Sequence, residues 1–262
     1  MTFKEVIFGT SVFTFAQQFG HRSRLYELDF KKQPENVEKL LNYAYDEGNL
    51  DTLMLRNSDD LIAGVDLSIK SGHAWSCIGF TSEDNFNSDM ELFSKYEMST
   101  VILDGFFVDE CIKKGEIDRV VDYLKRLSGE YGYVAGIETR MPFNHLDKIY
   151  NSDIFKYIDV IMLPINFYGY MMDCNFLNKE NRKLMDELLS LYDEKKVIAN
   201  RTLAAGVLSP AEAYQFMKDV KYVDAVCVGM SKEAEIDETM KTIYDVMSWI
   251  FYFFFSFFYK FY

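Results

Sequence analysis

Short apolar segments alternate with amphipathic helical patterns along almost the whole chain, and this alternation limits the fold more than any other feature. Each apolar segment has the length of a strand and is followed by a polar or helical stretch. Strands are predicted within residues 5–13, 50–57, 74–82, 99–109, 133–142 and 158–169. Residues 197–240 add two further units, each of a strand, a glycine-containing loop and a helix.

Strict alternation of strands and helices predicts a parallel sheet with helical crossovers. Eight such units within about 250 residues are typical of a closed (β/α)8 TIM barrel. A doubly wound open sheet is the alternative, but no strand is followed by a GxGxxG helix start. We therefore predict one barrel domain over residues 1–247, with an aromatic segment at 248–262 that is not part of the barrel.

Net charge and targeting signals restrict the partners. The chain carries a formal charge of −13, which argues against nucleic acid as a partner because phosphate backbones need a basic surface. The four cysteines show no CxxC spacing, and the N-terminal residues lack the pattern of a secretory signal. We expect a cytoplasmic protein with free thiols.

The segment 248–262, SWIFYFFFSFFYKFY, is almost entirely aromatic. It is shorter than the roughly 20 apolar residues that a membrane-spanning helix needs. An interfacial anchor, a contact with a second copy of the chain, and an extension without a function of its own stay open as alternatives.

In a barrel of this class the chemistry takes place at the carboxyl ends of the strands. Polar side chains near those ends are therefore the candidate site residues. Three of them, Asp104, Glu138 and Arg201, are candidate catalytic groups, because carboxylates flanked by arginine can orient an anionic substrate and move a proton. The candidate substrate-binding residues are Arg56, Arg140, Asn166 and Asn200.

The last two units resemble the aldo-keto reductase superfamily. The resemblance rests on three motifs: VIANRTLAAGVLSPAEA, VDAVCVGMSKEAEIDETM and, near the N-terminus, IFGTSVF. The resemblance implies that the loops after strands seven and eight hold the phosphates of a nicotinamide dinucleotide, with NADP as the cofactor. The matching residues are Gly206, Gly229, Ser231 and Lys232. Helix N-termini with nearby serine and lysine side chains are suited to anions.

The catalytic half of the family pattern is not matched. No tyrosine occurs between Tyr45 and Tyr96, and the ends of the third and fourth predicted strands lack the family's lysine and histidine. The chain is therefore expected to be a divergent member in which carbonyl reduction lacks its usual proton donor. Whether it is an enzyme stays open at this point.

Three functions follow as alternatives. The first is a reductase-like barrel that binds a phosphorylated small molecule or a dinucleotide, and the second is a lyase or isomerase of a phosphorylated or carboxylated metabolite. The third is a non-catalytic binding or scaffold barrel. All of the catalytic alternatives predict an anionic small-molecule ligand.

No metal site is predicted, although a mixed site of Asp104, Glu138 and His145 is conceivable. The basic segment 21–32 is expected to be a surface loop or a lid, with Arg22 or Arg24 reaching an anion.

Overall fold

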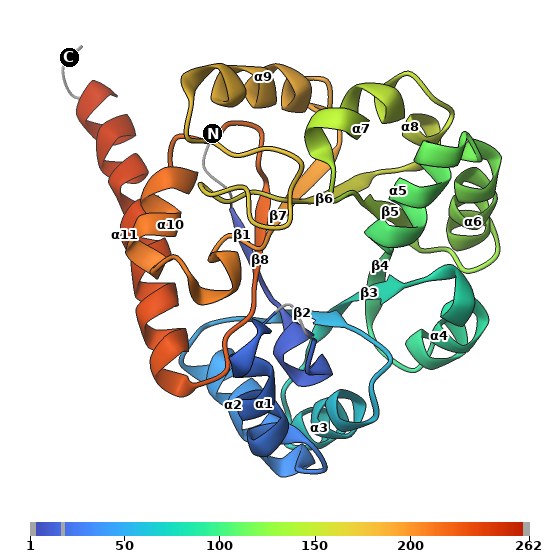
Figure 1. Ribbon diagram of the computed structural model, residues 1–262. Helices are drawn as coiled ribbons and strands as arrows, with labels where there is room; N and C mark the ends of the chain where they lie inside the picture. The colour runs from blue at the N-terminus through green and yellow to red at the C-terminus, as the bar shows by residue number, and fades with distance from the viewer. Residues whose placement is uncertain (1–3, 17–18, 259–262) are drawn as a thin grey trace.

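The computed structural model describes residues 4–16 and 19–258, and side chains as far as residue 246. Eight parallel strands form a closed barrel in chain order, and β8 pairs with β1, where Glu5 lies opposite Ala225. The helices surround this ring (Figure 1). The strands are β1 (Glu5–Phe8), β2 (Thr52–Leu55), β3 (Ser76–Thr81), β4 (Met98–Leu103), β5 (Val134–Glu138), β6 (Val160–Pro164), β7 (Lys196–Asn200) and β8 (Ala225–Val228). The predicted (β/α)8 barrel is confirmed.

The helices follow the strands in the expected alternation, with additional short ones. They are α1 (His21–Phe30), α2 (Pro34–Asp46), α3 (Asp59–Lys70), α4 (Phe86–Phe93), α5 (Gly105–Lys114), α6 (Ile117–Gly129), α7 (Pro142–Tyr150), α8 (Ile154–Tyr157), α9 (Lys179–Ser190), α10 (Pro210–Met217) and α11 (Glu233–Phe258). The 3-10 turns are η1 (Thr10–Thr14), η3 (Glu83–Asn85) and η4 (Ala204–Gly206).

Local sequence signals explain where these helices begin and end. Ser209 and Glu212 form a capping box at the start of α10, in which each side chain bonds the backbone N–H of the other residue. Gly115 ends α5 in the left-handed conformation, with φ of 76°. On α6, Val120 and Leu124 lie on the buried face, at the spacing of one helical turn.

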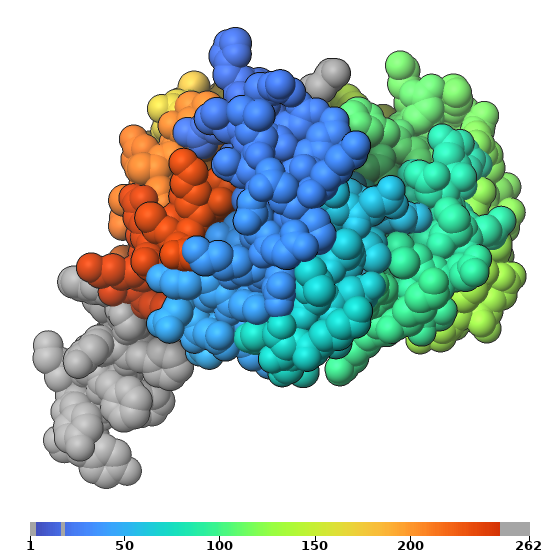
Figure 2. Space-filling model, turned by 90° about the horizontal axis from the view of Figure 1, so that it is seen from below, coloured from blue at the N-terminus to red at the C-terminus, as the bar shows by residue number. Residues whose placement is uncertain are grey.

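Several predicted boundaries were wrong. The strands predicted over 5–13, 133–142 and 158–169 end at Phe8, Glu138 and Pro164. The strand predicted over 99–109 ends at Leu103, because Asp104 accepts a hydrogen bond from the backbone N–H of Phe106 and begins α5 there. The segment 21–32, predicted as a loop, is mostly the helix α1. Only Tyr26 and Phe30 of α1 are buried, so its sequence carries almost no periodic apolar signal. In Figure 2 this blue N-terminal segment projects beyond the neighbouring surface.

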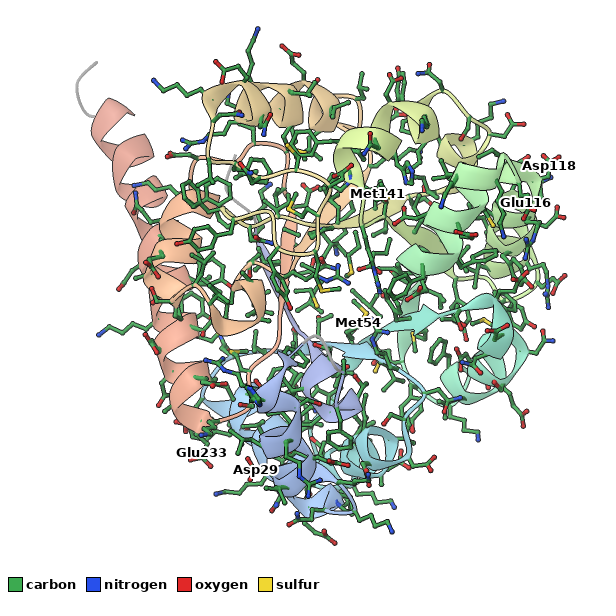
Figure 3. All side chains as sticks on the ribbon, in the orientation of Figure 1. Asp29, Met54, Glu116, Asp118, Met141 and Glu233 are labelled. Carbon is green, nitrogen blue, oxygen red and sulfur yellow. The ribbon has the colours of Figure 1, made fainter. Side chains whose placement is uncertain are left out.

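The barrel has an inner and an outer core. The inner cluster consists of strand side chains that point to the barrel axis: Ile7, Met54, Ile78, Phe80, Ile102, Val160, Met162, Ile198 and Ala225. Alternate residues of the same strands, such as Leu53 and Leu55 on β2, pack outward against the helices. Figure 3 shows Met54 near the centre of the ring of strands.

The aromatic segment 248–262 falls largely outside what the structure describes. The backbone continues α11 as far as Phe258, but the side chains from residue 247 onward and the whole of residues 259–262 lie outside the described part. Its separation from the barrel and its role as a contact surface therefore stay predictions. Among the described residues, no helix is long and apolar enough to cross a membrane.

Candidate functional site

The alternation of side chains along each strand decides which strand-end residues enter the barrel. Met54 points inward, so Arg56, two residues later, also points inward. The same step leads from Ile102 to Asp104 and from Ile198 to Asn200. Glu138 is the last residue of β5, one residue beyond the outward-facing Ile137. Side chains from four strands thus meet at one mouth.

Glu138 is the centre of this group. It is fully buried, and its Oε1 accepts hydrogen bonds from Arg201 Nη1 at 2.8 Å and from Asn200 Nδ2 at 2.9 Å. Its Oε2 accepts from the backbone N–H of Gly105 at 3.1 Å and from Arg140 Nε at 3.4 Å. One carboxylate therefore fixes side chains that come from β7 and from the loops after β5 and β7.

The charge state of Glu138 follows from its neighbours. Burial by itself would raise the pKa of Glu138, but Arg201, Arg140 and Arg56 together lower it to about 2. The carboxylate is therefore ionised at any physiological pH. A group with so low a pKa is a weak proton acceptor, so Glu138 is better suited to holding arginines than to acting as a general base.

Asp104 touches this network at its edge. Its Oδ1 accepts from the backbone N–H of Phe106 at 2.7 Å, and its Oδ2 lies 3.7 Å from Arg140 Nη2. Burial and the charge of Glu138 raise the pKa of Asp104, while Arg140 and Arg56 act in the opposite direction. Asp104 is not among the described residues that line the cavity, so the structure gives it the role of a helix cap beside the site.

Arg56 differs from the other two arginines of the mouth. Its guanidinium lies 3.6 Å from the centre of the Phe80 ring and faces the cavity. Within the described part of the chain it makes no ion pair within 4.0 Å and no side-chain hydrogen bond given by the structure. Burial lowers the pKa of Arg56, while Glu138 and Asp104 counteract this shift. The charge of Arg56 is therefore only partly compensated.

The cavity at the mouth has a volume of about 520 Å³. Its inner end is lined by Arg56, Glu138, Asn200 and Arg201. Met54, Met162 and Cys227 also line it; Met54 and Met162 belong to the inner core, and Cys227 packs against that core. The cavity continues outward to the loops after β7 and β8. A volume of this size suits a small metabolite.

The four residues predicted to hold an anion on the β7 and β8 loops do not all face the cavity. Gly206 and Gly229 line the cavity, whereas Ser231 and Lys232 do not. The backbone N–H and the Oγ of Ser231 both donate to Glu235 Oε2, at 2.7 and 3.0 Å. Lys232 is exposed in a separate hollow beside α1 and α2. A carboxylate of the chain itself thus occupies the donors that a phosphate would use.

Gly206 lies against the guanidinium of Arg22. Its φ is 80°, and a Cβ at this position would lie 1.8 Å from Arg22 Nη1. Arg22 Nη2 donates to the carbonyl oxygen of Gly206 at 3.4 Å. Arg22 therefore reaches the cavity from α1, while its predicted contact with an anion stays a prediction. Arg24 instead pairs with Glu27 on the exposed side of the helix.

The loop after β7 adopts backbone conformations that are rare outside glycine. Arg201, Ala204 and Ala205 have positive φ values of 53°, 47° and 55°. A left-handed conformation costs a residue with a side chain about 1–2 kcal/mol. Such strain is found most often at functional sites, and here it lies beside the cavity.

Two predicted substrate-binding residues have other contacts. Asn166 closes a turn, since its Nδ2 donates to the carbonyl oxygen of Tyr170 at 3.0 Å and its Oδ1 accepts from the backbone N–H of Tyr170 at 2.7 Å. Arg140 lies 3.3 Å from the centre of the Phe106 ring. Neither residue is among the described residues that line the cavity, whereas Arg56 and Asn200 are.

His145 does not join Glu138. Its Nδ1 lies 2.8 Å from Asp109 Oδ1, and the same carboxylate accepts from Thr139 Oγ1 at 2.6 Å and from the backbone N–H of Arg140 at 2.9 Å. This network braces the turn between β5 and α7. Among the side chains of residues 4–16 and 19–246, no group of His, Cys, Asp and Glu is arranged to hold a metal ion.

The sequence reasoning missed several cavity residues. Tyr26, Tyr170, Glu235 and Glu238 line the cavity but lie in helices and a loop, away from strand ends. Segment 21–32, which contains Tyr26, was expected as a possible lid, but no local pattern indicates that Tyr170, Glu235 and Glu238 face the mouth. Cys227 could have been found, because it is on β8 and shares the inward direction of Ala225.

Comparisons with known proteins support the fold. No family model matches the sequence, and no curated protein gives a significant match. Two solved structures from Pseudomonas aeruginosa, each described as a "putative aldo-keto reductase", align with TM-scores of 0.63 and 0.64 at 14% identity. Each alignment covers 94% of this chain and 92% of the other. They share its fold. A Bacteroides uniformis β-glucuronidase aligns with a TM-score of 0.51 at 8% identity, over 74% of this chain and 28% of that one.

Proposed function

We propose that the barrel binds an anionic small molecule, bearing a carboxylate or phosphate group, at Arg56 and Arg201 in the mouth. The observation that carries this proposal is the partly buried guanidinium of Arg56, which faces the cavity without a carboxylate partner of its own. Arg201 lines the same cavity, and its buried Nε has no hydrogen-bond partner.

The charges of the mouth support an anionic ligand. Arg56, Arg140 and Arg201 bring three positive charges, while Glu138 and Asp104 bring at most two negative ones. Burying an uncompensated charge is costly, and a bound anion would remove that cost. Arginine is also well shaped for carboxylate and phosphate oxygens.

The network around Glu138 would hold this site in place before a ligand arrives. Glu138 fixes the Nη1 end of Arg201, and Asn200 bonds the same carboxylate oxygen. Preorganised donors lose less entropy on binding than free side chains do. A lyase or isomerase reaction at this site would need a base other than Glu138, because its pKa of about 2 makes it a poor proton acceptor.

A nicotinamide dinucleotide is the second candidate ligand. Two features favour it: the cavity runs from the mouth to Gly206 and Gly229, and the fold is shared with proteins described as putative aldo-keto reductases. The donors of Ser231 do not fit a phosphate as they stand, because Glu235 occupies them. Titration with NADPH, followed by protein fluorescence, tests this candidate, and no quenching at millimolar NADPH would exclude it.

The anion site is tested with Arg56→Met and a matched control, Arg24→Met, at an exposed arginine outside the cavity. Malonate and inorganic phosphate are titrated at constant ionic strength while the Tm is measured. At an anion concentration of about ten times Kd, a single site stabilises the folded state by roughly 1.4 kcal/mol. The wild type and Arg24→Met should show this saturable rise.

Arg56→Met should lose the anion-dependent rise. Its stability without anion should also fall, because Arg56 helps to keep Glu138 ionised, so the rise is measured from each variant's own anion-free Tm. An equal rise in Arg56→Met would refute the proposal. A rise in Tm that depends only on ionic strength and is the same in the wild type and both variants would also refute the proposal, because it would show charge screening and not binding at a site.

A further inference from the structure

The two ends of the cavity carry opposite charge. Arg56 and Arg201 lie at the inner end, whereas Glu212, Glu235 and Glu238 line the part beside α10 and α11. Arg22 is the cation that lines this outer part. Three carboxylates against one guanidinium leave the outer end negative.

These carboxylates are not neutralised by the chain. Among the described residues, none of Glu212, Glu235 and Glu238 forms an ion pair within 4.0 Å. Glu212 accepts from Ser209, and Glu235 accepts from Ser231, so both close the N-terminus of a helix. The backbone donors that could have attracted an anion to this end are thus already used.

Glu238 has no such capping role. It lines the cavity, is exposed to solvent, and its carboxylate makes no hydrogen bond that the structure gives. The negative charge of Glu235 also affects the neighbouring Tyr26. The burial of Tyr26 and the charge of Glu235 both raise the pKa of Tyr26. The outer end therefore has a negative potential to which Glu238 contributes a carboxylate that is free to meet a ligand.

We infer that the ligand is dipolar, with an anionic group at Arg56 and Arg201 and an ammonium or similar cationic group toward Glu238. This inference rests on the proposed anion site and narrows its ligand class. A ligand with a second anionic group at its far end would meet the carboxylates of α10 and α11, which repel it, whereas an ammonium group would be attracted.

Matched straight-chain probes test the inference. One set is hexanoate, 6-aminohexanoate and adipate, and a longer set is octanoate, 8-aminooctanoate and suberate. Each set keeps one carboxylate and changes only the far end. Binding is measured by titration calorimetry near neutral pH. For the set whose length spans the cavity, the amino acid should bind about tenfold more tightly than the alkanoate, and the diacid more weakly than the alkanoate.

Glu238→Gln should remove most of the preference for the amino acid and leave alkanoate binding unchanged. Asp237→Asn is the matched control, because Asp237 is the adjacent residue of α11, does not line the cavity and accepts a hydrogen bond from Tyr43 at 2.9 Å. This control should keep the full preference.

The outcomes separate the two proposals. Equal or tighter binding of the diacid, with binding of all probes lost in Arg56→Met, would overturn the dipolar ligand while keeping the anion site. An unchanged preference in Glu238→Gln would overturn it as well. If no probe binds in a way that depends on Arg56, the anion site is refuted and the dipolar ligand with it.

Discussion

Replacing Glu138 with Gln tests the central electrostatic argument. The carboxylate is fully buried and contacts Arg201 and Arg140, so its loss leaves Arg201 without its counterion and Arg140 with only the more distant Asp104. Its pKa of about 2, against an ordinary value of 4.5, corresponds to about 3 kcal/mol of stability. Removing one partner of a buried pair typically costs about 3–5 kcal/mol. We therefore expect a loss of at least about 3 kcal/mol near neutral pH.

The pH dependence gives a second, independent signature. The pKa of Glu138 is lower in the folded state, so its contribution is complete above about pH 4.5 and is lost as the pH falls toward 2. At about pH 3.5, Glu138 is still ionised in the folded state but mostly protonated in the unfolded chain. This difference reduces the contribution of Glu138 to the free energy of unfolding by about 1.4 kcal/mol. The difference in stability between the wild type and Glu138→Gln should therefore narrow by this amount in acid.

The assay is urea unfolding followed by circular dichroism at neutral and acid pH. Glu130→Gln serves as the control, because Glu130 is exposed and pairs with Arg126 on the surface. This control should change stability by less than about 0.5 kcal/mol at either pH. A neutral-pH loss below about 1 kcal/mol in Glu138→Gln, or a loss that stays constant into acid, would refute the reasoning.

Three further predictions concern the cavity wall. Gly206→Ala should destabilise the protein by about as much as Gly132→Ala, as measured by urea unfolding: both positions have positive φ, and the exposed guanidinium of Arg22, which the new Cβ at 206 meets, can move aside. A clearly larger loss in Gly206→Ala would contradict this, because it would show that Arg22 is held in place. Ala205→Gly should raise stability by about 0.5–1 kcal/mol and so raise the Tm, because glycine adopts the left-handed conformation without strain. A lower Tm would contradict this. Cys227 should react far more slowly with a thiol reagent than an exposed cysteine, since burial raises its pKa to about 12; mass spectrometry of the alkylated protein checks this, and early labelling of Cys227 would be the contrary result.

The barrel could be predicted from the sequence because its signal is local and repeated. An apolar strand followed by an amphipathic helix can bury both elements only by stacking against the next unit, and repetition of this unit eight times closes the sheet. The same regularity placed Arg56, Glu138 and Asn200 at the mouth. Their direction into the barrel follows from the two-residue period of a strand.

Tertiary structure alone decided how these residues pair and what covers them. Asn166 and Arg140 stand near strand ends just as Arg56 does, yet one closes a turn and the other packs on Phe106. Glu235 lines the cavity from α11 and accepts hydrogen bonds from the backbone N–H and the Oγ of Ser231. Side chains on helices and loops have no fixed direction toward the barrel axis, so their contacts depend on how each crossover packs. The sequence by itself thus determined the barrel and the position of its mouth, whereas only packing decided which charges of the mouth remain free for a ligand.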